Sequence, residues 1–223
     1  MKQSRFFAIY EEEKVRQKAL YTVNLVPGEK VYDEKLVNVN NIEYREWNPR
    51  KSKMAAAILK GIGQIGLRPE QIVLYLGASS GTTPSHFSDI LGKEGFMFAL
   101  DFAPRVVRDL VKLCEKRKNM CPILADANHP EEYAGNICEV DFLYQDIAQK
   151  NQAEIFIKNI DWFLKSGGFA MLCVKSRSMD VTANPRDIYK KIKAELEKRY
   201  TMIDWMELDP LEKDHCVFLV KKK

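Results

Sequence analysis

The stretch Val73–Gly92, VLYLGASSGTTPSHFSDILG, decides the fold, because an aliphatic strand runs into a glycine-rich turn and then directly into a helix. Gly77 and Gly81 allow a tight turn and let a ligand approach the backbone closely. Thr82 and Thr83 stand where the first free N–H groups of the helix point outward. The pattern predicts a ligand-binding turn between a strand and a helix.

Two known patterns compete for this turn. It matches G-x-S-x-G, the nucleophile elbow of α/β-hydrolases with Ser79 as nucleophile, and the later residues would complete the triad in the order Asp146 or Asp209, then His215. As a dinucleotide loop it departs from G-x-G-x-x-G at Ser79 and Thr82. Only 72 residues precede the strand and none forms an HGGG-type oxyanion motif, which disfavours the hydrolase.

The residues before the turn form a different pattern. Residues 1–47 contain short alternating runs, at Phe6–Tyr10, Ala19–Leu25 and Lys35–Val39, which indicate a small antiparallel β module. Asn48-Pro49 is then expected to cap a helix that ends at Gly61 and Gly63.

From Val73 onward, strands and helices alternate. Strands are expected near 72–76, 96–100, 121–125, 140–145, 168–174, 201–207 and 215–220, and helices near 84–91, 104–118, 151–165 and 186–199. Such alternation predicts an α/β fold with a mostly parallel seven-stranded sheet and helices on both faces. Ligands then bind outside the carboxyl ends of the strands.

Three consecutive predicted strands end in a carboxylate. Asp101 lies 24 residues after Gly77, close to the offset at which an acid binds ribose hydroxyls, and Asp126 and Asp146 end the next two strands. A rim of acids suits a ribose and an adenine better than a phosphate-rich dinucleotide. S-adenosylmethionine, which has no phosphates, is the cofactor most compatible with it.

Composition limits the remaining possibilities. With 46% hydrophobic residues in 223, the chain can bury one full-sized core, and its net charge of +4 gives weak support to an anionic partner. The five cysteines form no C-x-x-C pair and the three histidines have no metal-ligand spacing, so we expect neither disulfides nor a metal. No apolar run has membrane length, and we expect a cytoplasmic protein without a membrane partner.

Several blocks resemble fibrillarin, the family of ribose 2′-O-methyltransferases of box C/D ribonucleoproteins: LYLGASSGTTPSHFSDI, ALDFAPR, PILADANHP, YQDIAQKNQAEI, SRSMDVTANP and LEKDHCVF, with YREWNPRKSKMAAAI upstream. The resemblance covers essentially the whole chain. It implies a class I, Rossmann-like methyltransferase domain at 48–223 behind the β module at 1–47. The chain begins without the Gly/Arg-rich tail of eukaryotic nucleolar members and so resembles the archaeal ones, in keeping with a cytoplasmic location.

The resemblance also assigns residues. For S-adenosylmethionine it implies Gly77, Ala78, Thr82, Thr83, Asp101, Phe102, Asp126, Ala127, Asp146, Ile147, Ala148 and Gln149. Many members have Glu where this chain has Asp101, which retains the carboxylate. The Lys, Asp, Lys, His set of ribose methyltransferases falls on Lys53, Asp146, Lys175 and His215.

A ribose 2′-hydroxyl is a poor acid, so it must be hydrogen-bonded or deprotonated as it attacks the methyl group. Lys175 is the candidate base, and the alternative is that it stays charged and stabilises the developing alkoxide. Residue order alone leaves both roles open.

RNA binding rests on basic residues near the rim, namely Arg50, Lys51, Arg177 and Arg186. The sequence contains no RNA-recognition module. The resemblance therefore implies that a guide RNA selects the target rRNA or tRNA, with a Nop-domain scaffold and a kink-turn-binding ribosomal-type protein as partners. A non-catalytic assembly subunit is the alternative.

Overall fold

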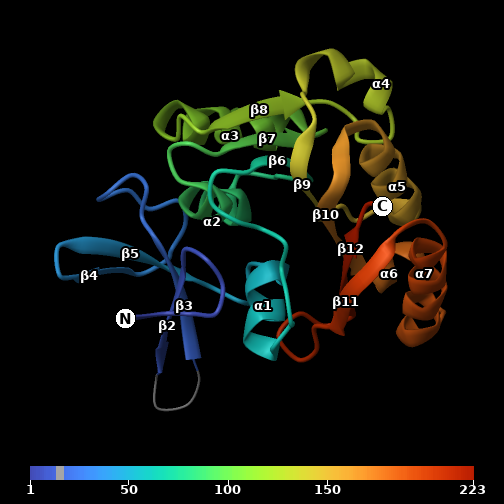
Figure 1. Ribbon diagram of the computed structural model, residues 1–223, viewed down its shortest axis with the longest axis horizontal. Coiled ribbons are helices and arrows are strands. Elements are labelled where there is room, and N and C mark those ends of the chain that lie inside the picture. The colour runs from blue at the N-terminus through green and yellow to red at the C-terminus, as the bar shows by residue number, and fades with distance from the viewer. Residues whose placement is uncertain (14–17) are drawn as a thin grey trace.

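Two β-sheets organise the computed structural model, which describes residues 1–13 and 18–223 (Figure 1). The smaller sheet is antiparallel, in the order β1-β2-β3-β5-β4, and confirms the predicted β module. Its strands are β1 Lys2–Gln3, β2 Ile9–Glu13, β3 Lys18–Val23, β4 Leu36–Val39 and β5 Ile42–Trp47.

Two details of this sheet differ from expectation. The run at Phe6–Tyr10 is not a strand throughout, because Ala8 has a positive φ of 56° and β2 begins only at Ile9. Strand β5 follows a tight turn at Asn40 and Asn41, both also at positive φ, and was not expected from alternation.

The larger sheet has seven strands in the order β11-β12-β10-β9-β6-β7-β8. The pairs within β10-β9-β6-β7-β8 are parallel, and β12 is antiparallel to β10 and β11. The strands are β6 Ile72–Leu76, β7 Phe96–Asp101, β8 Met120–Leu124, β9 Val140–Gln145, β10 Leu164–Lys175, β11 Thr201–Glu207 and β12 His215–Lys221. The mostly parallel, doubly wound sheet is confirmed.

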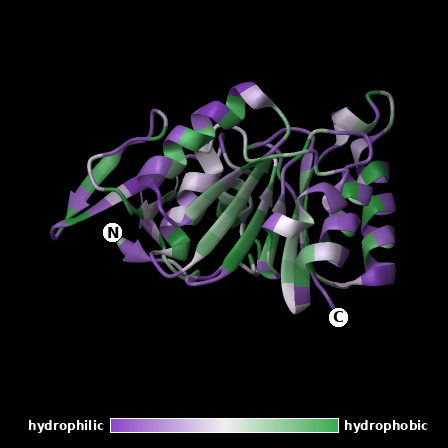
Figure 2. Ribbon diagram, turned by 90° about the horizontal axis from the view of Figure 1, so that it is seen from above, coloured by the Kyte–Doolittle hydropathy of each residue, from purple (hydrophilic) through white to green (hydrophobic). Residues whose placement is uncertain are grey.

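Helices cover both faces of this sheet. They are α1 Lys53–Lys60, α2 Thr82–Leu91, α3 Pro104–Lys116, α4 Pro130–Tyr133, α5 Gln152–Phe163, α6 Ser176–Met179 and α7 Pro185–Arg199, with a 3₁₀ turn at Ala134–Asn136. Alternate residues of β6 point to opposite faces: Val73 and Tyr75 pack with α1, α2 and α3, whereas Leu74 and Leu76 pack with α5 and α7. Figure 2 shows the strands as the most hydrophobic ribbons, between helices with polar outer faces.

The helix before the larger sheet begins later than expected. Its cap is Ser52, whose side chain accepts a hydrogen bond from the Ala55 N–H at 3.4 Å, and not Asn48. Gly61 ends the helix in the left-handed conformation, as the sequence indicates. Lys53 is therefore the first residue of α1.

A buried network of charges joins the small sheet to α2. Arg45 of β5 donates to Glu34 at 2.7 Å and to Asp89 of α2 at 2.8 Å, and Arg117 donates to Asp89 at 2.6 Å. All four side chains are almost completely buried. Because buried charges are stable only when paired, this network fixes α2, and with it the turn at Thr82, against the small sheet.

Within residues 1–13 and 18–223, no helix is both long enough and apolar enough to cross a membrane.

Candidate active site

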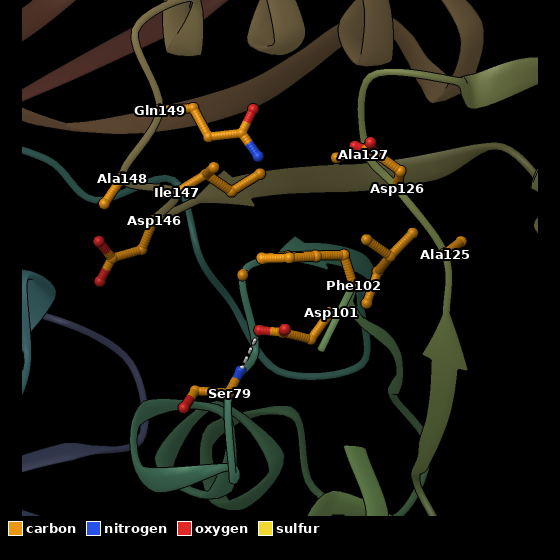
Figure 3. A pocket seen from close by; sticks show the side chains of 12 residues that line it. Ser79, Asp101, Phe102, Ala125, Asp126, Ala127, Asp146, Ile147, Ala148 and Gln149 are labelled. Carbon is orange, nitrogen blue, oxygen red and sulfur yellow. Dashed lines mark hydrogen bonds between the residues drawn. The ribbon is translucent and has the colours of Figure 1, made fainter. Parts of the chain in front are cut away.

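A cavity of about 380 Å³ opens where the strand order reverses. The chain runs from β6 to β7 and β8 on one side and returns to β9 on the other, so the loops after β6 and β9 diverge. The cavity is lined by Gly77, Ser79, Leu100, Asp101, Phe102, Ala125, Asp126, Ala127, Asp146, Ile147, Ala148 and Gln149 (Figure 3). All of these except Ser79, Leu100 and Ala125 were expected to bind the cofactor.

Gly77 is the point at which the loops after β6 and β9 meet. Its φ is +84°, and a Cβ atom there would lie 2.3 Å from the backbone oxygen of Asp146. Its N–H and that of Ala78 both donate to the Leu100 carbonyl at 2.9 Å. Only glycine permits this conformation and this close approach together.

Asp101 is held by backbone donors. Its Oδ2 accepts from the Ser79 N–H at 2.8 Å, the contact drawn in Figure 3, and its Oδ1 accepts from the Ala103 N–H at 3.0 Å. Each carboxylate oxygen can accept a second hydrogen bond. The side chain is thus fixed and still able to accept from two ligand hydroxyls. Position 79 contributes its backbone here, a role that side-chain patterns do not reveal.

Asp126 and Phe102 lie on neighbouring loops of the same cavity. The backbone N–H of Asn128, donating at 2.9 Å, is the main cause that lowers the pKa of Asp126, so this carboxyl stays ionised. Asn128 also donates to Gln149 at 3.1 Å, which ties the loop after β8 to the loop after β9. Phe102 is 64% exposed, and its ring suits stacking on a planar base.

A second cavity, of about 320 Å³, adjoins the first and shares Gly77, Ser79 and Asp146 with it. The rest of its lining is Lys51, Lys53, Tyr75, Ala78, Thr82, Thr83 and Pro84. The expected cofactor residues of the glycine-rich turn therefore lie on this side. Lys51, Tyr75 and Pro84 were expected neither to bind the cofactor nor to take part in catalysis.

Lys53 and Asp146 form an ion pair at the junction of the two cavities. Lys53 Nζ lies 2.9 Å from Asp146 Oδ2, and the Asp146 carboxyl points away from the Gln149 amide (Figure 3). Burial lowers the pKa of Lys53, but the Asp146 carboxylate outweighs burial and the net pKa is raised. Lys53 is therefore a fixed cation.

Lys175 and His215 face each other across the antiparallel pair β10 and β12, where they are register partners. The Lys175 N–H donates to the Gln152 side chain at 3.3 Å, and Gln152 Nε2 donates to the Gln149 carbonyl at 2.9 Å. Buried Gln152 thus connects the end of β10 to the loop that lines the first cavity. Both Lys175 and His215 lie outside the linings of the two cavities.

The His215 ring has a defined hydrogen-bonding state. Its Nδ1 lies 2.7 Å from the Lys213 carbonyl, which can only accept, so Nδ1 carries a proton. The hydrogen-bond partner of this nitrogen is a backbone oxygen, with the Glu212 carboxylate farther away at 4.0 Å, and Asp146 is engaged by Lys53. Neither Asp146 nor Asp209 therefore accepts the Nδ1 proton of His215, as the Ser, Asp, His triad of the hydrolase alternative requires.

The basic residues expected to bind RNA are differently engaged. Arg50 is exposed, and Lys51 pairs with Asp33. Arg177 lies 3.2 Å from Asp214, and Arg186 lies 3.4 Å from Glu207. The two arginines are thus partly neutralised by neighbouring acids, whereas Lys51 contributes directly to the second cavity.

The comparisons with known proteins agree on one family. A family model described as fibrillarin matches residues 1–223. The fibrillarin-like rRNA/tRNA 2′-O-methyltransferase of Methanocaldococcus jannaschii is 49% identical over 203 residues, which cover 91% of this chain and 88% of that protein. The Aeropyrum pernix fibrillarin structure with natively bound S-adenosyl-L-methionine has a TM-score of 0.90 at 41% identity, covering 98% of this chain and 96% of that one. A fibrillarin/Nop5p complex also has a TM-score of 0.90, at 37% identity, covering 99% and 100%.

Proposed function

The chain belongs to the fibrillarin family, and we propose that it is the catalytic subunit of a box C/D ribonucleoprotein that methylates ribose 2′-hydroxyls of rRNA, and of tRNA, with S-adenosylmethionine. The similarity to a relative of that activity and to a structure with the bound cofactor supports this. The observation that carries it is the pair of adjoining cavities, with acids and an aromatic ring at one end and the Lys53–Asp146 pair at the junction.

The residues of the site fit S-adenosylmethionine. Gly77 lies so close to Asp146 that there is no space for a side chain, and at this point the cofactor would contact backbone atoms. Each carboxylate oxygen of Asp101 keeps a lone pair for one ribose hydroxyl. The Phe102 ring and Asp126 lie where an adenine would be bound. Thr82 and Thr83 begin α2 on the other side of Gly77, beside the second cavity, where the amino acid part of the cofactor would lie. When bound, the cofactor supplies an activated methyl group.

The acceptor hydroxyl loses its proton as its oxygen becomes methylated. Lys53 remains an ammonium because Asp146 holds it, and so it is unsuited to accept that proton. We assign proton transfer, or stabilisation of the alkoxide, to Lys175 and assign its orientation to His215 and Gln152. The Asp146 carboxylate keeps Lys53 in place, and the Asp146 backbone packs against Gly77 where the two cavities meet.

Target choice is assigned to partners. Guide RNA pairing, a Nop-domain scaffold and a kink-turn-binding ribosomal-type protein would supply the specificity that this chain lacks, and the similarity to the fibrillarin/Nop5p complex supports the scaffold. Arg50, Lys51, Arg177 and Arg186 are proposed to contact RNA phosphates, and the protein is proposed to act in the cytoplasm.

Reconstitution tests this function. The isolated chain should bind S-adenosylmethionine but show little site-selective methylation, and guide RNA with both partner proteins should restore methylation at one guided nucleotide. The modified nucleotide should move when the guide sequence is changed. Cofactor binding without methylation in the full assembly would favour the non-catalytic alternative, and selective methylation by the chain alone would refute the dependence on a guide.

A further inference from the structure

The main chain of Lys175 lies where β10 has lost one of its two neighbouring strands. Pairing between β10 and β9 ends at Leu172 and Gln145, so the last residues of β10 extend beyond β9. On the other side β12 continues, and the Ser176 N–H donates to the Asp214 carbonyl at 3.1 Å. Successive residues of a strand direct their peptide groups to opposite sides, so the N–H and carbonyl of Lys175 face the side where β9 has ended.

Gln152, the first residue of α5, occupies the place of the missing strand. Its Oε1 accepts from the Lys175 N–H at 3.3 Å, and its Nε2 donates to the Lys175 carbonyl at 3.4 Å and to the Gln149 carbonyl at 2.9 Å. The backbone carbonyl of Gln152 in turn accepts from the Gln145 side chain at 2.6 Å. Both Gln145 and Gln152 are completely buried, so bulk water cannot replace these hydrogen bonds.

The same side chain reaches the loop that lines the first cavity. Gln149 belongs to that lining, and its side-chain oxygen accepts from Asn128 at 3.1 Å. Asn128 Nδ2 also donates to Asp126 at 2.9 Å, and Asp126 and Gln149 come from separate loops (Figure 3). Hydrogen bonds therefore connect Asp126, at the proposed adenine end, through Gln149 and Gln152 to the end of β10.

Lys175 itself is exposed, so its main chain, rather than packing around its side chain, fixes where it lies. A group that transfers a proton must be within hydrogen-bond reach of the reacting hydroxyl. A displacement of about 1 Å can lower a rate by about a hundredfold. The contacts of Gln152 set the Lys175 main chain relative to the cofactor loop.

We propose that Gln152 is a positioning residue for methyl transfer that joins the cofactor loop and the end of β10 into one rigid unit, so that Lys175 keeps a fixed place relative to the bound cofactor. Gln152 thereby couples the cofactor side of the site to the acceptor side. The inference rests on the proposed function, because it needs Lys175 to act on the hydroxyl.

The test is a double-mutant cycle between Gln152 and Lys175, with single-turnover methylation rates measured in the complex assembled with guide RNA and both partner proteins. Gln152→Met keeps the approximate volume of the side chain and removes its three hydrogen bonds. We expect it to lower the rate by about tenfold to a hundredfold at saturating S-adenosylmethionine. In the Lys175→Ala background the same change should lower the rate by less than about twofold, because the positioned group is already absent.

A second measurement does not depend on activity. Hydrogen exchange of the Lys175 N–H should become faster by about twofold to tenfold in Gln152→Met, the range for one lost hydrogen bond. Gln152→Glu keeps the acceptor for this N–H but loses both donated hydrogen bonds. It should therefore retain the protection from exchange, and its methylation rate should fall between those of Gln152→Met and the wild type.

Asn119→Leu is the matched control. The buried Asn119 side chain also makes three hydrogen bonds, donating to the Ser88 and Gly92 carbonyls at 2.9 and 2.7 Å and accepting from the Ser88 hydroxyl at 2.7 Å. Its loss should lower stability, as Gln152→Met does. Any effect on the methylation rate should be the same factor with and without Lys175.

The outcomes separate this inference from the proposed function. If Gln152→Met lowers the rate by the same factor with and without Lys175, or by no more than Asn119→Leu does, Gln152 does not act through Lys175 and the inference is wrong. Unchanged exchange of the Lys175 N–H in Gln152→Met would also overturn it. A wild-type complex that binds S-adenosylmethionine but does not methylate the guided nucleotide would overturn the proposed function, while the exchange result would still show whether Gln152 holds the Lys175 main chain.

Discussion

Asp146 at the end of β9 holds Lys53 at the start of α1, with 2.9 Å between Oδ2 and Nζ. This contact joins the larger sheet to the helix that follows the small one. It also fixes a cation beside the glycine-rich turn, where both cavities meet.

Asp146→Asn should therefore change the ionisation of Lys53. Burial would then outweigh the weaker remaining partners of the ammonium, and the pKa of Lys53 should fall. In the wild type the raised pKa means that the pair stabilises the fold below the ordinary lysine pKa of 10.5 and that this stabilisation is lost as the pH rises above it. NMR titration of labelled lysines measures the pKa, and denaturant unfolding at a series of pH values measures the stabilisation. Asp141→Asn, which removes the partner of Lys165, should leave Lys53 unchanged.

Gly77→Ala should destabilise the protein more than Gly28→Ala. Both glycines have φ near +85°, but a Cβ at Gly28 meets nothing within 4 Å, whereas one at Gly77 meets the Asp146 oxygen. Backbone strain costs about 1–2 kcal/mol at either site, and overpacking adds about 1–3 kcal/mol at Gly77. Denaturant unfolding measures the difference. If Gly77→Ala and Gly28→Ala reduce stability equally, the loops after β6 and β9 can move apart to accept the added Cβ at no cost in free energy.

Asp101→Asn should weaken S-adenosylmethionine binding by about 1.5–3 kcal/mol, the range for a hydrogen bond to a charged group. One amide oxygen cannot replace two carboxylate oxygens that each already accept from a backbone N–H. Calorimetry measures the affinity for S-adenosylmethionine, and Asp109→Asn, which changes an exposed residue of α3, is the control. The assignment of Asp101 to the ribose fails if the affinity is unchanged.

Lys175→Ala should lower the single-turnover methylation rate in the assembled complex by about 10²–10⁴, the usual contribution of a positioned acid or base. Cofactor affinity should stay nearly constant, because Lys175 lies outside both cavity linings. Lys118→Ala, which changes an exposed lysine before β8, is the control.

Lys175→Arg separates the two roles of this residue. An arginine cannot give up its proton but can still stabilise an alkoxide. An inactive Lys175→Arg variant therefore indicates that Lys175 acts as a base, and a partly active variant indicates that it stabilises the alkoxide. A rate for Lys175→Ala close to that of Lys118→Ala would remove Lys175 from the active site.

The sequence predicts the larger sheet and its cavity well because both depend on local patterns. Hydrophobic strands followed by acids place Asp101, Asp126 and Asp146 at one edge of a parallel sheet, whatever the details of packing. The position of Ser52 as the helix cap could not be read in the same way, because Asn48 offers an equally good cap four residues earlier.

Contacts between distant segments were beyond prediction from patterns. Arg45 reaches Glu34 and Asp89 inside the protein, yet alternation alone does not distinguish a buried arginine from an exposed one. The turn before β12 folds against the end of β10, where the Ser176 N–H donates to the Asp214 carbonyl, and sequence patterns do not indicate that contact. The hydrogen bonds of Gln152 to Lys175 and to the Gln149 carbonyl likewise depend on the end of β10 lying beside the loop after β9.

The buried network of Arg45, Glu34, Asp89 and Arg117 also has a consequence for how this chain can diverge. Loss of any one member would strand a charge in the interior at a cost of about 3–5 kcal/mol, a large part of the stability of a typical domain. Single substitutions there should be purged by selection, and viable changes should arrive in compensating pairs. A chimaera that takes its first 47 residues from a distant relative should fold only if that relative also has glutamate and arginine at positions 34 and 45, because Asp89 and Arg117 come from this chain.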